Sequence, residues 1–293
     1  HTSRSLPTYY QFSAMWSGQE GSTLLWMFWH AVLGIVLIFK AKEWESPVLT
    51  IVALAQVMLG SMLLGIYIFH YKFGSSPFAL MRDTMDIPIF KMNPDWVAED
   101  GTGLNPSLQN YWMVIHPPTL FLGFAACTVP AAFAIASLWV REYKTWVKAV
   151  LPWSLFALMI LGTGILMGGA WAYEALSFGG FWAWDPVENA SLVPWLLLAA
   201  AIHVLMAYKH SGYSLHATYI FFIGCFLLIL YSSFLTKSGI LGDASVHAFT
   251  DLGMSGQLIA CIVVFLVPSV ILLILRIKQN EIPSKPEEEK LSS

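Results

Sequence analysis

Charged side chains are scarce in this sequence. They make up 11% of its 293 residues, whereas hydrophobic residues make up 57%. A soluble domain usually carries about 25% charged residues, so the composition argues against a soluble globular protein. Apolar runs of about 20 residues recur along the chain instead, and each is long enough to cross a hydrocarbon core about 30 Å thick. We count seven of them, at about 22–40, 47–70, 117–140, 148–168, 190–208, 216–235 and 254–276.

Because backbone polar groups inside lipid must be hydrogen-bonded within their own segment, these runs are expected to be helices. The sequence therefore predicts an all-α polytopic membrane protein with long external loops. One membrane domain would cover residues 1–280, and the polar residues 281–293 would form a disordered cytoplasmic tail. No signal peptide precedes the first run, and the first residue is histidine rather than methionine, which leaves open that the chain is a piece of a longer protein.

Cysteine is also rare. The three cysteines, Cys127, Cys225 and Cys261, lie inside apolar runs, and none has a partner at C-x-x-C or metal-ligand spacing. We therefore expect them to be small buried apolar residues. The sequence contains no C-x-x-C-H, which excludes covalent attachment of haem c to this chain itself.

Lysine and arginine are unevenly distributed between the two sides of the membrane. The connections between successive predicted spans alternate between these sides. One side, with the loops 41–46, 141–147, 209–215 and the tail, has ten of them with the helix ends included. The other side, with 1–21, 71–116, 169–189 and 236–253, has five in much longer loops. The positive-inside rule makes the first side cytoplasmic and the second side external. The external loop 71–116 is far longer than an ordinary connection, so we expect it to be functional.

One external stretch, residues 178–195, concentrates aromatic rings. It reads FGGFWAWDPVENASLVPW, with four aromatic residues among its first seven, beside glycines and directly ahead of an apolar run. We interpret this half as a flat apolar platform at the bilayer surface, suited to a large planar ligand. In the second half, Asp185 is a favoured N-cap, Pro186 a favoured first helical residue, and Glu188 completes a capping box. These carboxylates are therefore predicted to begin a helix rather than to perform acid–base catalysis.

Two histidines flank this stretch on the external side. His116 precedes two prolines at the start of the third run, where we expect an extended backbone, and His247 lies in the last external loop. Two neutral imidazoles on one face, with an aromatic platform between them, are suited to axial haem ligation. His203, inside the fifth run, is a candidate because ionisable residues within a membrane are often functional. His30 in the first run and His70 at an outer interface have no second indication of a role.

The residues singled out above resemble those of the haem-handling proteins of cytochrome c maturation, which include the CcmF and NrfE haem-lyase subunits and the CcsA proteins. These share a tryptophan-rich (WWD-type) external loop, roughly WGGWWxWDPVENASxxPWL, which stands here as FGGFWAWDPVENASLVPWL at 178–196. Residues 1–26 and 105–124 (NPSLQNYWMVIHPPTLFLGF) are similar to the CcmF branch in particular. The likeness runs to about residue 250. It departs from the family at Phe178 and Phe181, where phenylalanine can stack on a porphyrin but donates no hydrogen bond.

The resemblance implies that the chain is a haem lyase component of a bacterial inner membrane, with its active face toward the periplasm. His116 and His247 would bind haem axially, and the ring would be supported by Phe181, Trp182, Trp184 and Trp171. Thiols of an apocytochrome c C-x-x-C-H segment would add to the haem vinyl groups. Haem-delivery and thiol-reducing maturation proteins would be further partners; no nucleic acid is expected.

A second haem b within the membrane is also implied by the resemblance, with His203 as one ligand. In CcmF proteins the other ligand lies in helices beyond the end of this chain. A second chain, a truncation or a replacement by His30 would each account for the difference, and the sequence does not decide among them. Two other classes of function remain open as well: a transporter of haem or another substrate, with His203 and His30 on its path, and a structural subunit whose aromatic loop only docks a partner.

Overall fold

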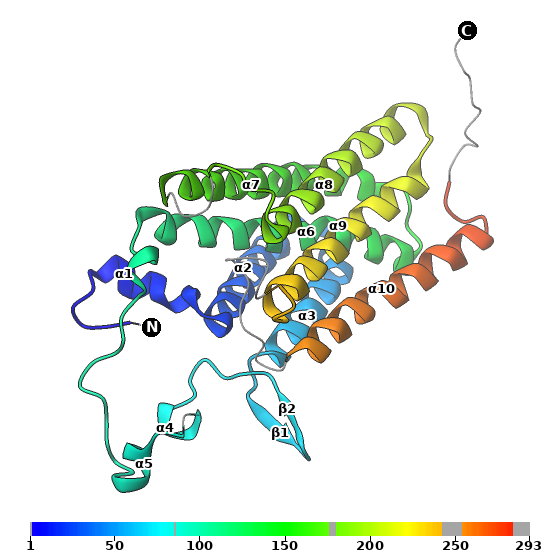
Figure 1. Cartoon of the computed structure of the whole chain (residues 1–293). Coiled ribbons are helices and arrows are strands. Elements are labelled where there is room, and N and C mark those ends of the chain that lie inside the picture. The colour runs from blue at the N-terminus through cyan, green and yellow to red at the C-terminus, as the bar shows by residue number, and fades with distance from the viewer. Residues whose placement is uncertain (1, 85, 176–179, 242–253, 284–293) are drawn as a thin grey trace.

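The chain folds into a bundle of long helices (Figure 1). The computed structural model describes all residues except 1, 85, 176–179, 242–253 and 284–293. Within the described residues, seven helices are long and apolar enough to cross a membrane, which confirms the predicted polytopic membrane protein. They are α2 (Gln19–Lys40), α3 (Glu45–Ser61), α6 (Tyr111–Val140), α7 (Thr145–Ala175), α8 (Pro186–Ser211), α9 (Leu215–Lys237) and α10 (Ser255–Lys278).

Contacts between helix ends show how the helices alternate in direction. The start of α6 meets the end of α7 through Trp112, whose Nε1 donates to Glu174 Oε2 at 2.8 Å. The start of α2 meets the end of α9 through Gln19, whose Nε2 donates to the Lys237 carbonyl oxygen at 2.9 Å. We call this end of the bundle, at which α2, α6, α8 and α10 begin, the loop end. The connections there carry short elements, namely α1 (Thr8–Ser13), η1 (Ala14–Ser17), β1 (Ile66–Ile68), β2 (Tyr71–Phe73), α4 (Met81–Thr84), α5 (Pro88–Met92) and η3 (Pro106–Leu108).

The second span is shorter than hydropathy predicts. Helix α3, which follows the short η2 (Lys42–Trp44), ends at Ser61, and the predicted run to residue 70 is wrong. Residues 66–68 instead pair antiparallel with 71–73. The composition remains apolar there, but Gly65 adopts a positive φ of 61°, which turns the chain, and the β-branched and aromatic residues after it suit a strand.

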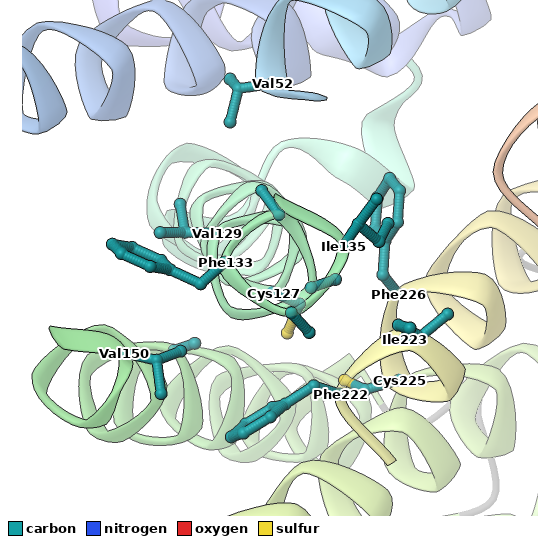
Figure 2. Packing of buried hydrophobic residues seen from close by; sticks show 14 of the residues in the cluster. Val52, Cys127, Val129, Phe133, Ile135, Val150, Phe222, Ile223, Cys225 and Phe226 are labelled. Atoms are coloured by element: carbon teal, nitrogen blue, oxygen red, sulfur yellow. The ribbon is translucent and has the colours of Figure 1, made fainter. Parts of the chain in front are cut away.

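Helix α6 forms the centre of the bundle and packs against α2, α3, α7, α9 and α10. Small residues allow this close approach: a Cβ on Gly123 would lie only 2.7 Å from Leu161 Cα in α7. Figure 2 views α6 nearly along its axis, with Val52 of α3 on one side and Phe222 of α9 on the other. All three cysteines are buried and unbridged, as predicted.

The third span begins earlier than predicted. Helix α6 starts at Tyr111, where the Asn110 side chain accepts from Trp112 N at 3.0 Å, so the prediction of an extended backbone at His116 is wrong. Two prolines follow His116 inside the helix. Pro117 cannot donate to the Met113 carbonyl four residues earlier. That carbonyl is instead satisfied by Trp16, whose Nε1 donates to it at 3.0 Å, and this contact allows the helix to continue through the proline.

At the opposite end, polar contacts tie α10 to the connection between α6 and α7. Arg276 Nε donates to the Leu138 carbonyl oxygen at 3.0 Å, and Tyr143 Oη donates to Glu281 Oε2 at 2.6 Å. Ile282 is buried against the bundle. Glu281 and Ile282, the first two residues of the predicted tail, therefore pack on the protein.

Candidate functional site

A cavity of about 360 Å³ lies at the loop end, lined by residues of η1, α2, α6, α7, α8, α9 and the aromatic stretch. Aromatic and aliphatic side chains form most of its wall. Its polar lining groups are an imidazole, a carboxylate, an ammonium group and several hydroxyl groups, from His116, Glu188, Lys237, Ser17, Ser22, Ser191, Ser232, Ser233 and Thr236. Apolar cavities of about 300–1,000 Å³ with a few placed polar groups are typical of small-molecule and cofactor sites.

His116 reaches this cavity from the second turn of α6. Its Nδ1 donates to the Gly164 carbonyl oxygen of α7 at 2.9 Å. Since a carbonyl can only accept, this bond places the lone pair of a neutral ring on Nε2. A hydrogen bond from one ring nitrogen is also how metal-binding histidines are usually oriented. The ring lies edge-on to Trp171, with 5.9 Å between the ring centroids.

A glycine makes room for this imidazole. A Cβ on Gly168 of α7 would lie 2.8 Å from His116 Cε1, closer than carbon atoms normally approach. One turn earlier in α7, Gly164 supplies the carbonyl that accepts from Nδ1. The glycines of α7 therefore fix both the position and the tautomer of His116.

Two tryptophans that line the cavity carry buried indole N–H groups. Trp171 Nε1 and Trp182 Nε1 have no hydrogen-bond partner within the described part of the chain. Buried donors without a partner cost free energy, about 1–3 kcal/mol each. Their position in the cavity wall suits a ligand that can accept a hydrogen bond there.

The aromatic stretch does not form a single flat surface. Trp182 lines the cavity, whereas Trp184 is 71% exposed and stands at 90° to it, with 6.2 Å between the ring centroids. Phe181 packs on α7, where a Cβ on Gly169 would lie 2.6 Å from its ring. Phe178 lies outside the described residues. The stretch thus presents Trp182 to the cavity, whereas Trp184 and part of Phe181 face the surroundings.

The capping box predicted at the start of α8 is confirmed. Asp185 Oδ1 accepts from Val187 N at 2.7 Å, and Glu188 Oε2 accepts from Asp185 N at 3.2 Å. Glu188 Oε2 also accepts from Ala183 N at 3.0 Å, and Asn189 Nδ2 donates to the Trp184 carbonyl oxygen at 3.1 Å. The polar half of the motif therefore holds the backbone of its aromatic half.

The structure places two of the other candidate histidines, His203 and His30, away from the cavity lining. His247 is outside the described residues. His203 is exposed on α8, with Nδ1 donating to the Ala199 carbonyl oxygen at 2.7 Å. His30 is buried and its Nε2 bonds to Thr128 Oγ1 of α6 at 2.9 Å. The structure therefore does not bring His30 and His203 together.

Trp16 and Lys237 also line the cavity, and neither was among the sequence candidates. Trp16 lies in the N-terminal connection, far from the aromatic motif in sequence, and only its contact with Met113 places it at the cavity. Lys237 ends an apolar run and counts in the sequence merely as an external cation. Its burial, at 3% exposure, depends on helix packing that no local pattern indicates.

Comparison with known proteins relates this chain to one family. A family model described as "Cytochrome C assembly protein" matches residues 16–241. The chain is 38% identical over 254 residues to the cytochrome c-type biogenesis protein CcmF of Haemophilus influenzae. The aligned region covers 86% of this chain and 36% of that protein. It is 36% identical over 274 residues to CcmF of Escherichia coli, covering 93% and 40%. A solved structure described as "Cytochrome c Heme Lyase CcmF" matches with a TM-score of 0.68 at 28% identity, covering 92% of this chain and 38% of that chain. The chain thus spans about two fifths or less of the length of these relatives.

Proposed function

The chain belongs to the cytochrome c assembly protein family, and on this premise we propose that it takes part in cytochrome c biogenesis by holding haem, as a substrate, at the loop end of its bundle. The observation that carries the proposal is the cavity beside the aromatic stretch, with an oriented imidazole in its wall. The buried indole N–H groups of Trp171 and Trp182 fit a ligand with acceptor groups.

His116 Nε2 is the nitrogen that would bind the iron, because Nδ1 is engaged with the Gly164 carbonyl oxygen. We propose His247 as the opposite axial ligand. Trp182 and Trp171 would contact the porphyrin, and Phe181 would support this wall from behind. Trp184, which is exposed, is placed to contact an incoming protein.

The reaction proposed for the held haem is thioether formation with an apocytochrome c. Each thiol of a C-x-x-C-H segment adds across one vinyl group, with sulfur bonding to one carbon and hydrogen to the other, so the addition itself needs no oxidant or reductant. The chemistry belongs to haem and thiol, and the chain contributes position. In this role it would act as a haem lyase component alongside haem-delivery and thiol-reducing maturation proteins.

The loop end is proposed to face the periplasm from a bacterial inner membrane. The asymmetry of lysine and arginine between the two sides supports this orientation. The relatives described above are bacterial proteins.

An intramembrane haem b does not fit the described residues as a complete site. His203 offers an imidazole on the exposed face of α8, whereas His30 is bonded to Thr128 in the interior. We propose that His203 takes its partner ligand from another chain or segment.

Haem titration of the purified full chain in detergent tests the proposed external site. We expect a low-spin, six-coordinate spectrum in the wild type that is lost in His116→Ala and restored by added imidazole, which replaces the missing ligand. His210→Ala is the matched control, because His210 is exposed near the far end of α8. A wild type that binds no haem, or an unchanged spectrum in His116→Ala, would overturn the proposal.

A further inference from the structure

The β1–β2 hairpin is fixed to the bundle at its base. Gln257, in the first turn of α10, holds both ends of the hairpin segment: its Nε2 donates to the Ser61 carbonyl oxygen at 3.2 Å, and its Oε1 accepts from Gly74 N at 3.1 Å. Ser75 N donates to the Met62 carbonyl oxygen at 2.9 Å and closes the segment. Figure 1 shows the hairpin at the loop end, beyond α3 and α10, pointing away from α6 and α7. The place of the hairpin beside α3 and α10 is therefore set by the chain itself.

Beyond this base, the hairpin exposes apolar side chains on both of its faces. Successive residues of a strand point to opposite faces, yet all three residues of β1 are exposed: Ile66 at 44%, Tyr67 at 70% and Ile68 at 46%. Neither face of β1 is therefore buried in the part of the chain that the structure describes. A two-stranded hairpin on its own is marginally stable in water, and an exposed apolar patch marks a contact with protein or membrane.

Phe69 stands at the tip of the hairpin in a backbone conformation that aromatic residues rarely adopt. It is 92% exposed, and its φ is 54°. Because Ile68 pairs with Tyr71, Phe69 and His70 form a two-residue turn, and a positive φ at the first turn position favours glycine. Such outliers cluster where a residue makes a functional contact. The sequence thus places an aromatic ring where the local backbone would favour glycine.

The length of α3 places the hairpin at the level of the membrane surface. The helix has 17 residues, which span about 26 Å by helical rise. Glu43 and Glu45 fix its other end outside the hydrocarbon, whose thickness is about 30 Å. The residues that follow Ser61 therefore lie close to the hydrocarbon boundary. The exposed apolar surface also continues from Val57 of α3 through Leu64 to the hairpin.

The chemistry of the hairpin suits the interfacial layer of a bilayer and not its hydrocarbon core. Each strand of a two-stranded sheet has an outer edge of backbone groups, which water and headgroups satisfy but hydrocarbon does not. Tyrosine, here Tyr67, is enriched at this level. Between Glu45 and Asp83 the sequence contains no aspartate or glutamate. Its charged side chains there are Lys72 and Arg82, whose positive charge complements lipid phosphates.

We propose that the β1–β2 hairpin anchors the connections of the loop end to the bilayer. It lies in the interfacial layer of the leaflet on that side, with the Phe69 ring among the acyl chains and Lys72 beside the lipid phosphates. Lipid, and not a second chain or a further protein segment, covers this surface, because the surface is continuous with the exposed side of a membrane span. The inference goes beyond the proposed function and depends on no property of the haem site.

Fluorescence quenching in a bilayer tests the proposal without haem. The full chain with Tyr67→Cys is labelled with the environment-sensitive fluorophore NBD in nanodiscs of phosphatidylethanolamine and phosphatidylglycerol. The three native cysteines are buried, and wild-type protein treated in the same way gives the background. Val97→Cys is the matched control, because Val97 is 73% exposed in the same connection but lies beside Glu99 and Asp100, whose carboxylates keep it out of lipid.

We expect doxyl groups near the headgroup end of the acyl chains to quench the label at position 67 and to leave the label at position 97 unchanged. Aqueous iodide should quench mainly the label at position 97. Equal quenching by iodide at both positions would overturn the proposal, because the hairpin would then lie in water. A label at position 67 that neither quencher reaches would also overturn it, because protein would then cover the hairpin.

Phe69→Gly separates anchoring from a structural role of the tip. Glycine adopts a positive φ readily, so this variant should keep or raise the thermal midpoint in detergent. Combined with the label at position 67, it should nevertheless lower the quenching by doxyl lipid and raise the quenching by iodide, because the ring that holds the tip among the acyl chains is gone. A folded Phe69→Gly variant with unchanged quenching by both agents would refute the anchor.

Discussion

Gly168 should control the affinity of the proposed haem site through the orientation of His116. Its position in α7 faces the imidazole of His116, and a Cβ built there lies 2.8 Å from Cε1 and 3.4 Å from Nε2. Carbon atoms in contact are normally about 3.5–4.0 Å apart. In Gly168→Ala the ring must therefore move by roughly 0.7 Å or more.

That movement is enough to break the bond that orients the ring. Nδ1 and the Gly164 carbonyl oxygen are 2.9 Å apart, and a displacement of this size along the bond would bring them to about 3.6 Å, beyond hydrogen-bond distance. Loss of such an orienting contact typically costs about 10- to 100-fold in metal affinity. We therefore expect the dissociation constant for haem to rise by that factor in Gly168→Ala, with a smaller low-spin signal at a given haem concentration.

The control for this substitution is Gly34→Ala. Gly34 is also inside a membrane helix, but a Cβ there would meet only Leu49 Cδ2 at 3.9 Å, an ordinary contact. Alanine favours a helix over glycine by about 1 kcal/mol, so Gly34→Ala should keep or raise the thermal midpoint and bind haem as the wild type does. The proposed role of His116 orientation is refuted if Gly168→Ala is folded and its haem titration matches that of Gly34→Ala.

Two further predictions concern the helix ends. Asp185→Ala removes the oxygen that caps α8 and should lower stability by about 0.5–2 kcal/mol, seen as a lower thermal midpoint, whereas Asp185→Asn should lose less because an acceptor remains. Glu281→Gln should lower the pKa of Tyr143, which burial first and the Glu281 carboxylate second raise to about 12; ultraviolet titration against Tyr143→Phe would detect the shift, and an unchanged pKa would exclude the carboxylate as a cause. In the wild type the contribution of Tyr143 to stability is fully present below about pH 10, where the unfolded phenol is protonated, and is lost as the pH rises through about 12.

The existence of the seven spans follows from hydropathy, because crossing lipid imposes both length and apolar composition. Their ends do not follow from it. Residues 66–68 are as apolar as a span but form a strand, since Gly65 turns the chain and Ser76 packs within 2.8 Å of where its Cβ would be. His116 is helical although proline follows it, because Trp16 satisfies the carbonyl that Pro117 leaves without a donor. Both deviations depend on contacts with residues that lie outside the stretch of sequence over which hydropathy is averaged.

The same distinction holds within the site. The cap at Asp185 is predictable because donor and acceptor are two residues apart in the sequence. The partner of His116, the Gly164 carbonyl, is 48 residues away, and Lys237 meets Ser22 across 215 residues. Histidine and tryptophan can be identified as candidate ligand-binding residues from their type alone. The role of a backbone carbonyl, or of a single lysine at the end of a span, depends instead on the packing that surrounds it.

Two prolines, Pro117 and Pro194, each leave a backbone carbonyl beside the cavity without its usual helical donor. Pro117 of α6 leaves the Met113 carbonyl without its helical donor, and Pro194 of α8 does the same for Ala190. Trp16 Nε1 donates to the first carbonyl and Ser232 Oγ to the second, and both side chains line the cavity. Backbone groups left unsatisfied in a membrane cost several kcal/mol, and at these two positions a polar side chain from a neighbouring segment removes that cost. These two contacts hold the N-terminal connection and α9 against the helices that carry His116 and Glu188. The prolines therefore contribute to the wall of the cavity through the backbone carbonyls that they leave without a helical donor.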